Sequence, residues 1–322
     1  MTSVQDLGRQ NYLSQGVPFS GAMDSLSAQI ANLALGNHPN DAVIEFTQSG
    51  ASFITETDIL IAISGGGSIL RTRFGELPKN KPLFIPSGTE LFFKNDAQGC
   101  RSYLAVAGGW DVPEVLESRS TYIPARFGGF EGRCLKANDL LNAAGNLCAL
   151  TIAIADSLKA SSINYPKWSI VAGLFLPVDR KAIRVMRGRE FDWFENASRA
   201  DFFQQTFTLG HNSDRMGYQL TGTQLARKVE DELLSTAVTP GTIQVTNNGN
   251  PVLLMASCQT TGGYPRIAQV AAVDLPLCAQ LKAGDAISFK EIGWKEAEKL
   301  YIQQQLDLRK LAGAIRHHYQ FE

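Results

Sequence analysis

The sequence lacks the runs and clusters that mark several large classes of protein. None of its apolar runs approaches the ~20 residues needed to cross a bilayer, and residues 1–6 (MTSVQD) show neither the charged nor the apolar region of a signal peptide. We therefore expect a cytoplasmic protein without a membrane partner. The formal net charge is −1 and no basic block is present, which argues against a nucleic-acid partner.

Cysteine and histidine are scarce and scattered. The five cysteines form no Cys-x-x-Cys pair, and the four histidines show no His-x-x-x-His or His-Glu-x-x-His spacing. These absences argue against a disulfide framework and a zinc site, so we expect no metal ligand set. Cys258 lies beside a polar turn and is either a core residue or a nucleophile; we favour the core role, because no neighbouring histidine would lower its pKa.

Short β-type runs separated by Gly, Pro and Asn dominate the chain. Strands at this close spacing indicate a barrel or sandwich rather than a βαβ sheet. The triple glycine at 65–67 is interpreted as a strand-end turn, because no Gly-Lys-Ser/Thr follows it. The predicted strands lie at 43–46, 59–63, 83–85, 90–93, 102–106, 182–186, 241–246, 251–256, 267–273 and 286–289.

Helical patterns occur in a few places. Asp24 is a plausible N-cap for a helix that ends at Gly36, and 197–205 is a second helical stretch. The tail shows amphipathic spacing and packs either on its own chain, which we favour, or on a partner. We predict an N-terminal β domain at 1–150, a connector at 151–180, a second β domain at 181–292 and a tail helix at 293–322.

Polar side chains gather on a turn that follows the apolar run 251–256. The turn carries Gln259, Thr260 and Tyr264, and ends at Arg266. Its two glycines allow positive φ and a close backbone approach, and an arginine can bind a carboxylate or phosphate through two hydrogen bonds. The alternative is a plain hairpin turn whose polar groups face water. We favour the ligand-binding interpretation, because loop residues often carry function.

A guanidinium lies among hydroxyls at Arg119, which Ser118, Ser120 and Thr121 flank. This cluster suits recognition of a phosphate or carboxylate, but a polar turn with a solvent-facing arginine explains it equally well. Asp214 and Arg215 repeat the theme in the second β domain.

Charged and hydroxyl groups also lie near the N-terminus. Asp6 and Arg9 are three residues apart and can form an ion pair, and Ser20 precedes the Asp24 cap, where it could hold an anion at the positive end of a helix. Glu190 is either a general base or a structural anchor. Taken together, the candidate residues are rich in anion-binding groups and poor in nucleophiles. This composition suits the stabilisation of an anionic intermediate by fixed donors.

The separated motifs resemble the family of KipA and allophanate hydrolase subunit 2, also described as biotin-dependent carboxyltransferase-like proteins. The resemblance covers about residues 2–289 and implies two tandem cyclophilin-like β-barrel domains, hence a mainly β chain with few short helices and a C-terminal helix. The motifs that carry it are 4–9 (VQDLGR), 16–24 (GVPFSGAMD), 105–109 (AVAGG), 118–122 (SRSTY), 213–218 (SDRMGY) and 259–265 (QTTGGYP).

The resemblance also implies an activity. Stand-alone members of the family include the C subunit of 5-oxoprolinase, which acts with a KipI-like subunit and a LamB/YcsF-like subunit to open 5-oxoproline to glutamate. We therefore expect a hydrolase subunit that is inactive alone, a small-molecule substrate, and ATP used through the complex.

One alternative is the carboxyltransferase component of a urea carboxylase or allophanate hydrolase system. That role needs a biotin carrier in trans, because the chain has no biotin-attachment motif. Another is a non-catalytic regulator that binds a KipI-like kinase inhibitor.

In the mechanism that the resemblance suggests, the lactam carbonyl is activated by phosphorylation and then hydrolysed. Several positions depart from the family pattern, among them Ser257, which replaces an aspartate, and Arg189, which replaces the proline of a Gly-Pro-Glu triplet. The catalytic candidates are Asp6, Asp214, Arg119 and Arg215. The candidates for binding substrate or anion are Arg9, Ser20, Ser120, Gln259, Thr260, Tyr264 and Arg266.

Overall fold

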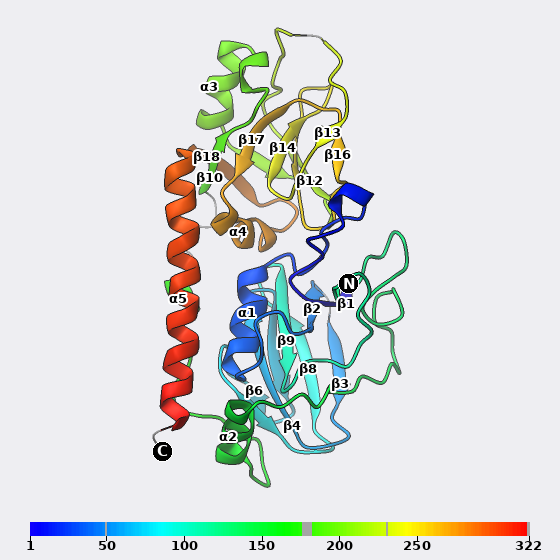
Figure 1. Ribbon diagram of the computed structural model, residues 1–322, viewed down its shortest axis with the longest axis vertical. Coiled ribbons are helices and arrows are strands. Elements are labelled where there is room, and N and C mark those ends of the chain that lie inside the picture. Colours follow the sequence, from blue (N-terminus) through cyan, green and yellow to red (C-terminus); the bar gives the residue numbers. More distant parts are fainter. Residues whose placement is uncertain (49, 176–181, 230, 321–322) are drawn as a thin grey trace. The chain divides into compact units, whose positions relative to one another are not determined.

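The computed structural model describes residues 1–48, 50–175, 182–229 and 231–320, and its backbone divides into two units (Figure 1). One unit comprises Met1–Gly8, Asp24–Leu176 and Leu306–Glu322, and the other comprises Arg9–Met23 and Pro177–Gln305. β-strands predominate in both units, so the expected mainly β fold class is confirmed.

The first unit contains two antiparallel sheets. A five-stranded sheet has the order β1 (Thr2–Gln5), β2 (Val43–Thr47), β9 (Arg101–Val106), β4 (Ile59–Gly65) and β7 (Leu83–Ile85). A four-stranded sheet has the order β3 (Ala51–Ile54), β8 (Glu90–Asn95), β5 (Ser68–Thr72) and β6 (Gly75–Glu76). The glycines at 65–67 connect β4 to β5, as expected for a strand-end turn.

Side chains from both sheets share one hydrophobic core. Phe46 on β2 stacks on Phe93 of β8, with ring centroids 4.1 Å apart, and Phe53 of β3 meets both rings edge-on. Helix α1 (Ser25–Ala34) packs against β4 and β9. Because β9 is covered on both faces, all six of its residues are buried, which explains why its sequence does not alternate.

The start of α1 follows the sequence signal. The Asp24 carboxylate accepts a hydrogen bond from the backbone N–H of Ser27 at 2.9 Å and another from the Ser27 hydroxyl at 2.7 Å. The predicted N-cap is therefore confirmed. Helix α2 (Ala149–Leu158) lies in the stretch assigned to the connector, where the sequence shows no clear helical period.

The strands of the second unit close into a seven-stranded barrel. Its order is β10 (Ala182–Arg187), β17 (Arg266–Val270), β14 (Thr242–Val245), β15 (Pro251–Leu254), β12 (Gly217–Thr221), β11 (Phe207–Leu209) and β18 (Ala286–Glu291). A parallel pairing between β10 and β18 closes the barrel, and the other pairings are antiparallel. A separate two-stranded antiparallel sheet pairs β13 (Thr236–Ala237) with β16 (Thr261–Gly262).

Helices accompany the barrel in this unit. Phe202 of α3 (Asn196–Gln204) stacks on Phe289 of β18, with centroids 4.6 Å apart. The C-terminal helix α5 (Trp294–Gln320) confirms the predicted tail helix, and Ala297 on it is buried with Val273 and Ile292 of the barrel unit. The other short elements are α4 (Leu275–Ala279), η1 (Leu13–Gln15), η2 (Ala172–Leu174), η3 (Phe191–Trp193) and η4 (Ala272–Asp274).

Candidate active site

Asp6 follows β1 and ties a distant loop to the end of that strand. Its carboxylate accepts hydrogen bonds from the hydroxyls of Ser118 (2.7 Å) and Ser120, and from the backbone N–H groups of Arg119 (2.6 Å) and Gly8 (2.8 Å). The side chain is buried, and a buried carboxylate requires such partners. This geometry favours a positioning role for Asp6: it fixes the loop that carries Arg119.

Arg119 is half exposed on this anchored loop. Its Nη2 lies 3.2 Å from Oε2 of Glu114, and 37% of the Arg119 side chain remains accessible. An exposed ion pair contributes little free energy, so an anionic ligand can displace Glu114. Ser120 differs, because its hydroxyl donates to Asp6 and accepts from the Asp6 backbone N–H at 2.9 Å. The hydroxyl of Ser120 thus holds the loop against Asp6.

Three more candidates lie together in the second unit. Arg9 is buried and its backbone N–H donates to the carbonyl oxygen of Phe19 at 2.7 Å. Ser20, also buried, adopts a left-handed backbone with φ 55°, a conformation that is uncommon for a residue other than glycine. Arg215 donates from Nη2 to the carbonyl oxygen of Gly21. The structure therefore brings Arg215 to the segment that holds Arg9 and Ser20.

Asp214 forms a tight turn before β12. Its Oδ1 accepts hydrogen bonds from the backbone N–H groups of Met216 (2.8 Å) and Gly217 (3.2 Å), and the residue is exposed. The backbone N–H of Ser257 donates to the carbonyl oxygen of Arg215 at 2.8 Å. Through this bond the 214–217 turn lies beside the residues that lead into the Gln259 turn.

The residues of the Gln259 turn differ in their exposure and hydrogen bonds. Gln259 is exposed, while the Thr260 carbonyl oxygen accepts from the N–H of Val238 at 3.0 Å and supports the two-stranded β13–β16 sheet. The carbonyl oxygen of Tyr264 accepts from Nε2 of Gln244 at 2.9 Å, and the residue is 43% exposed. The turn therefore presents Gln259 and Tyr264 to solvent.

Arg266 forms a two-pronged ion pair with Glu190. Its Nε donates to Oε2 at 2.7 Å and its Nη2 to Oε1 at 2.6 Å, while its Nη1 donates to the carbonyl oxygen of Ala237 at 3.1 Å. Burial alone would raise the pKa of Glu190, but the hydrogen bonds from Arg266 outweigh it and lower that pKa. This pairing supports the anchor interpretation of Glu190.

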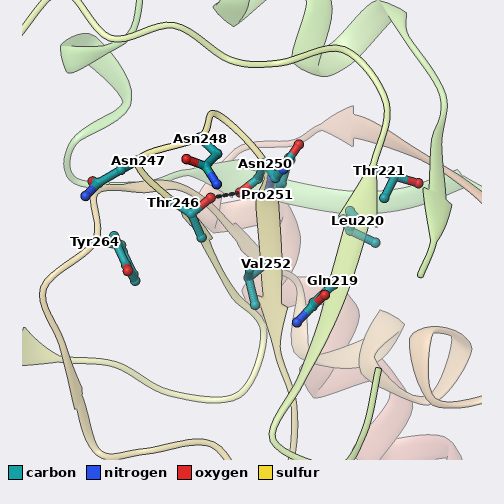
Figure 2. Close-up of a pocket in the computed structure, with 10 residues that line it drawn as sticks. All are labelled: Gln219, Leu220, Thr221, Thr246, Asn247, Asn248, Asn250, Pro251, Val252 and Tyr264. Atoms are coloured by element: carbon teal, nitrogen blue, oxygen red, sulfur yellow. Dashed lines mark hydrogen bonds between the residues drawn. The ribbon is translucent and has the colours of Figure 1, made fainter. Parts of the chain in front are cut away.

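A cavity of about 450 Å³ opens on the barrel between β12, the β14–β15 turn and Tyr264 (Figure 2). The Thr246 hydroxyl donates to the carbonyl oxygen of Asn250 at 3.2 Å and holds the β14–β15 turn in shape. Hydroxyl and amide groups dominate the described lining, which contains no charged side chain, so the cavity suits a neutral polar group. It is lined by Gln219, Leu220, Thr221, Thr246, Asn247, Asn248, Asn250, Pro251, Val252 and Tyr264.

Cys258 is buried beside the same turn, and burial raises the pKa of its thiol to about 12. A thiol with such a pKa stays protonated at neutral pH and is a poor nucleophile. The core role favoured for Cys258 is therefore supported. Within the described residues, no group of three or more His, Cys, Asp or Glu side chains is placed to hold a metal ion.

The candidates thus fall into separate groups. Asp6, Arg119 and Ser120 lie together in the first unit, whereas the others belong to the second. The amides of the cavity were missed by sequence reasoning, although Asn247, Asn248 and Asn250 are close together in the chain. Their Asn-Asn-Gly-Asn pattern signals a turn between strands, and only the fold shows that this turn lines a cavity.

The fold and these motifs define a carboxyltransferase-type protein. The family described as carboxyltransferase domain, subdomains A and B, matches residues 15–291, and the chain belongs to this family. The expected resemblance is confirmed.

Two curated relatives correspond to the chain along nearly its whole length. The C subunit of 5-oxoprolinase from Escherichia coli (strain K12) is 37% identical over 311 residues, which is 97% of this chain and 94% of that protein. The same subunit from Haemophilus influenzae is 34% identical over 316 residues, covering 96% of this chain and 94% of that protein.

Solved structures of larger enzymes contain the same fold. The urea amidolyase of K. lactis superposes with a TM-score of 0.84 at 30% identity, and the Kluyveromyces lactis urea carboxylase with 0.85 at 29%. Each match covers 96% of this chain but only 19% and 28% of those proteins. The chain therefore spans less than a third of either structure. None of the described helices is long and apolar enough to cross a membrane.

Proposed function

We propose that this protein is a subunit of an ATP-dependent 5-oxoprolinase complex that opens 5-oxoproline to glutamate with KipI-like and LamB/YcsF-like partners. The observation that carries the proposal is the end-to-end match to the C subunit of 5-oxoprolinase, which covers 97% of this chain and 94% of the relative. The urea amidolyases, in contrast, contain the matching region as 17% of their length.

The geometry suggests a division of labour among the candidates. Arg119 is held by a loop that Asp6 fixes, and its ion pair with Glu114 is exposed, so it is suited to bind the carboxylate or phosphoryl oxygens of an activated lactam. Asp214 is exposed, and the hydrogen bonds described for its carboxylate engage Oδ1 alone. Oδ2 of Asp214 can therefore accept a proton. Arg215 and Arg266 are already bonded within the second unit and serve as supports.

Reconstitution with the partner subunits tests this function. The chain is co-expressed with KipI-like and LamB/YcsF-like proteins, and ATP hydrolysis and glutamate release are measured with and without 5-oxoproline. We expect glutamate release coupled to ATP use by the complex and none by the chain alone. Ring opening by the isolated chain would contradict the expected dependence on partners, and a stable complex without turnover would contradict the proposed activity.

Within an active complex, Arg119→Ala should lower kcat/KM for 5-oxoproline by about a hundredfold, the usual loss for a donor that stabilises a developing anion. Arg119→Lys keeps the charge but not the two-pronged geometry, so it should recover part of that loss. Asp6→Asn should resemble Arg119→Ala in kcat/KM, because it loosens the loop. Arg71→Gln, which removes an exposed guanidinium on β5, is the control and should leave kcat/KM unchanged.

A second candidate function is carboxyl transfer, because solved relatives are a urea carboxylase and a urea amidolyase. In that case the uncharged cavity beside Tyr264 would suit a urea-type group, whose amides pair with amide and hydroxyl side chains. Transfer of a carboxyl group from an added carboxybiotin carrier would support this function. Hydrolysis of 5-oxoproline without a biotin carrier would exclude it as the principal activity.

A further inference from the structure

A second cavity, of about 270 Å³, lies on another side of the barrel where β10, β14 and β17 meet. It differs from the cavity beside Tyr264 because three arginines are among its lining residues. Arg187, Arg189 and Arg266 contribute to its lining together with Thr239, Thr242 and Gln269. Such a concentration of positive charge on one small cavity is not needed to fold a barrel.

Two of the arginines are held in place by carboxylates. Arg266 pairs with Glu190 through contacts of 2.6 and 2.7 Å. The Nε of Arg187 lies 2.7 Å from Oε1 of Glu291, and its guanidinium also covers the ring of Phe191 at 4.7 Å from the centroid. A guanidinium has five N–H donors, and these pairings leave donors on both arginines for another acceptor.

Arg189 lines the same cavity, but its side chain is in a different state. It is exposed, and its guanidinium makes no hydrogen bond or ion pair with any described residue. The charge of Arg189 helps to lower the pKa of Glu190, so the two groups are close enough to interact electrostatically. Two carboxylates, Glu190 and Glu291, face three guanidinium groups here, so one positive charge is left uncompensated.

The neutral side chains of the cavity are engaged with one another. The Thr242 hydroxyl donates to Oε1 of Gln269 at 2.9 Å and accepts from the backbone N–H of Thr239 at 3.2 Å. Nε2 of Gln269 donates to the carbonyl oxygen of Pro240 at 2.9 Å. These bonds hold Thr242 and Gln269 in place, and the charged donors that remain for a ligand are guanidinium N–H groups. Their natural partner is an acceptor-only anion.

We infer that this cavity binds a small oxyanion, a carboxylate or a phosphate, with Arg189 as its principal ligand. Arg187 and Arg266 assist from the sides, fixed by their carboxylates. The cavity is lined by residues of the second unit, and the inference stands whether or not the chain is a 5-oxoprolinase subunit. The sequence predicts an anion at Arg266. Because Arg266 is already paired with Glu190, we expect the anion to bind mainly to Arg189.

Isothermal titration of the full-length chain in a low-salt, phosphate-free buffer tests the site. Inorganic phosphate, L-glutamate and 5-oxoproline are the probes, and 2-pyrrolidinone, the uncharged lactam without a carboxylate, is the negative control. We expect saturable binding of at least one anion with Kd of about 1 mM, and none of 2-pyrrolidinone. A preference for phosphate or for a carboxylate identifies which source fills the site. Absence of saturable binding of all three anions would overturn the proposal.

Arg189→Gln should raise that Kd at least fivefold. Arg309→Gln is the matched control, because Arg309 is an exposed arginine on α5 outside the cavity. It removes the same charge and should leave the Kd unchanged. Equal Kd values for Arg189→Gln and the wild type, or equal weakening by both variants, would show nonspecific charge attraction and refute the site. Because Arg189 is exposed, unchanged thermal melting of the variant separates lost binding from lost folding.

Discussion

At the scale of single residues, the Glu190–Arg266 pair illustrates how burial decides what a charge does. The Glu190 and Arg266 side chains are only 5% and 16% exposed, and they meet through two short hydrogen bonds. A buried pair gains little over apolar packing, but loss of one partner leaves the other charge uncompensated. Both groups are therefore needed together.

We predict that Glu190→Gln lowers the free energy of unfolding by about 3 kcal/mol at pH 7, as measured by urea denaturation. The folded-state pKa of Glu190 is lowered, so its stabilising contribution is complete above the unfolded-state pKa of about 4.3 and is lost as pH falls through the folded-state pKa. The difference between wild type and variant should therefore shrink as the pH is lowered into that range.

The exposed pair Arg187–Glu291 provides the comparison. Its side chains are 57% and 40% exposed, so Glu291→Gln should cost about 0.5 kcal/mol or less. A similar loss for the two variants, or a Glu190→Gln deficit that does not change with pH, would show that the pair at Glu190 does not stabilise the fold by charge.

Local sequence identifies the types of residue at these positions but not their state. Its pattern marks Arg266 and Asp6 as groups that could meet a substrate, and both are instead paired with partners distant in the chain. Whether a charge is free or paired depends on three-dimensional contacts, which local sequence does not contain. The same holds for Arg189, whose importance is visible only once the barrel places it in one cavity with two paired arginines.

At the scale of elements, local signals predict most helices and strands, because apolar periodicity and turn residues act within a few positions. Helix α2 is missed for identifiable reasons. Its N-cap is Cys148, whose sulfur accepts from the N–H of Thr151 at 3.5 Å, rather than one of the usual Ser, Thr, Asp or Asn caps. The helix buries Thr151, Ile154 and Leu158 on one face, but the apolar Ile152 is exposed, so the sequence shows little contrast between the two faces.

A loop of the first unit depends on one glycine in particular. Gly132 has φ +65°, and a Cβ there would overlap the backbone carbonyl of Arg126. We predict that Gly132→Ala lowers the free energy of unfolding by about 3 kcal/mol, because both the left-handed backbone and the clash oppose the added methyl group. Thermal or urea unfolding measures the loss.

Gly145 separates the two causes. It has a similar φ of +73°, but nothing lies within 4 Å of the position that a Cβ would take. Gly145→Ala should therefore cost only the left-handed strain, about 1 kcal/mol. If both variants lose the same stability, the contact with Arg126 makes no measurable contribution.

At the scale of the whole molecule, closure of the barrel could not be inferred from local pattern. The parallel pairing joins Ile183 of β10 to Phe289 of β18, strands at opposite ends of the barrel segment. Each strand is predicted from its own residues, yet nothing in those residues states which distant strand is its neighbour. The family resemblance implies barrels, but it does not state which strands pair.

The five cysteines, all free, report on the packing of both units. Cys100, Cys258 and Cys278 are buried, and burial raises the pKa of the latter two thiols. Cys148 is exposed; partial burial opposes its ionisation, but hydrogen bonds from Thr151 and nearby backbone N–H groups outweigh this and lower its pKa.

We predict that Ellman's reagent labels Cys148 in a single fast phase at pH 7, because the thiolate is the reactive form, while the three buried thiols react only after unfolding in guanidinium. Half-buried Cys134 should react more slowly than Cys148. Cys148→Ser should abolish the fast phase without changing the thermal midpoint. Rapid labelling of Cys258 or Cys278 in the native protein would contradict the packing described for the barrel unit, whereas a fast phase that survives in Cys148→Ser would contradict the assignment to the α2 cap.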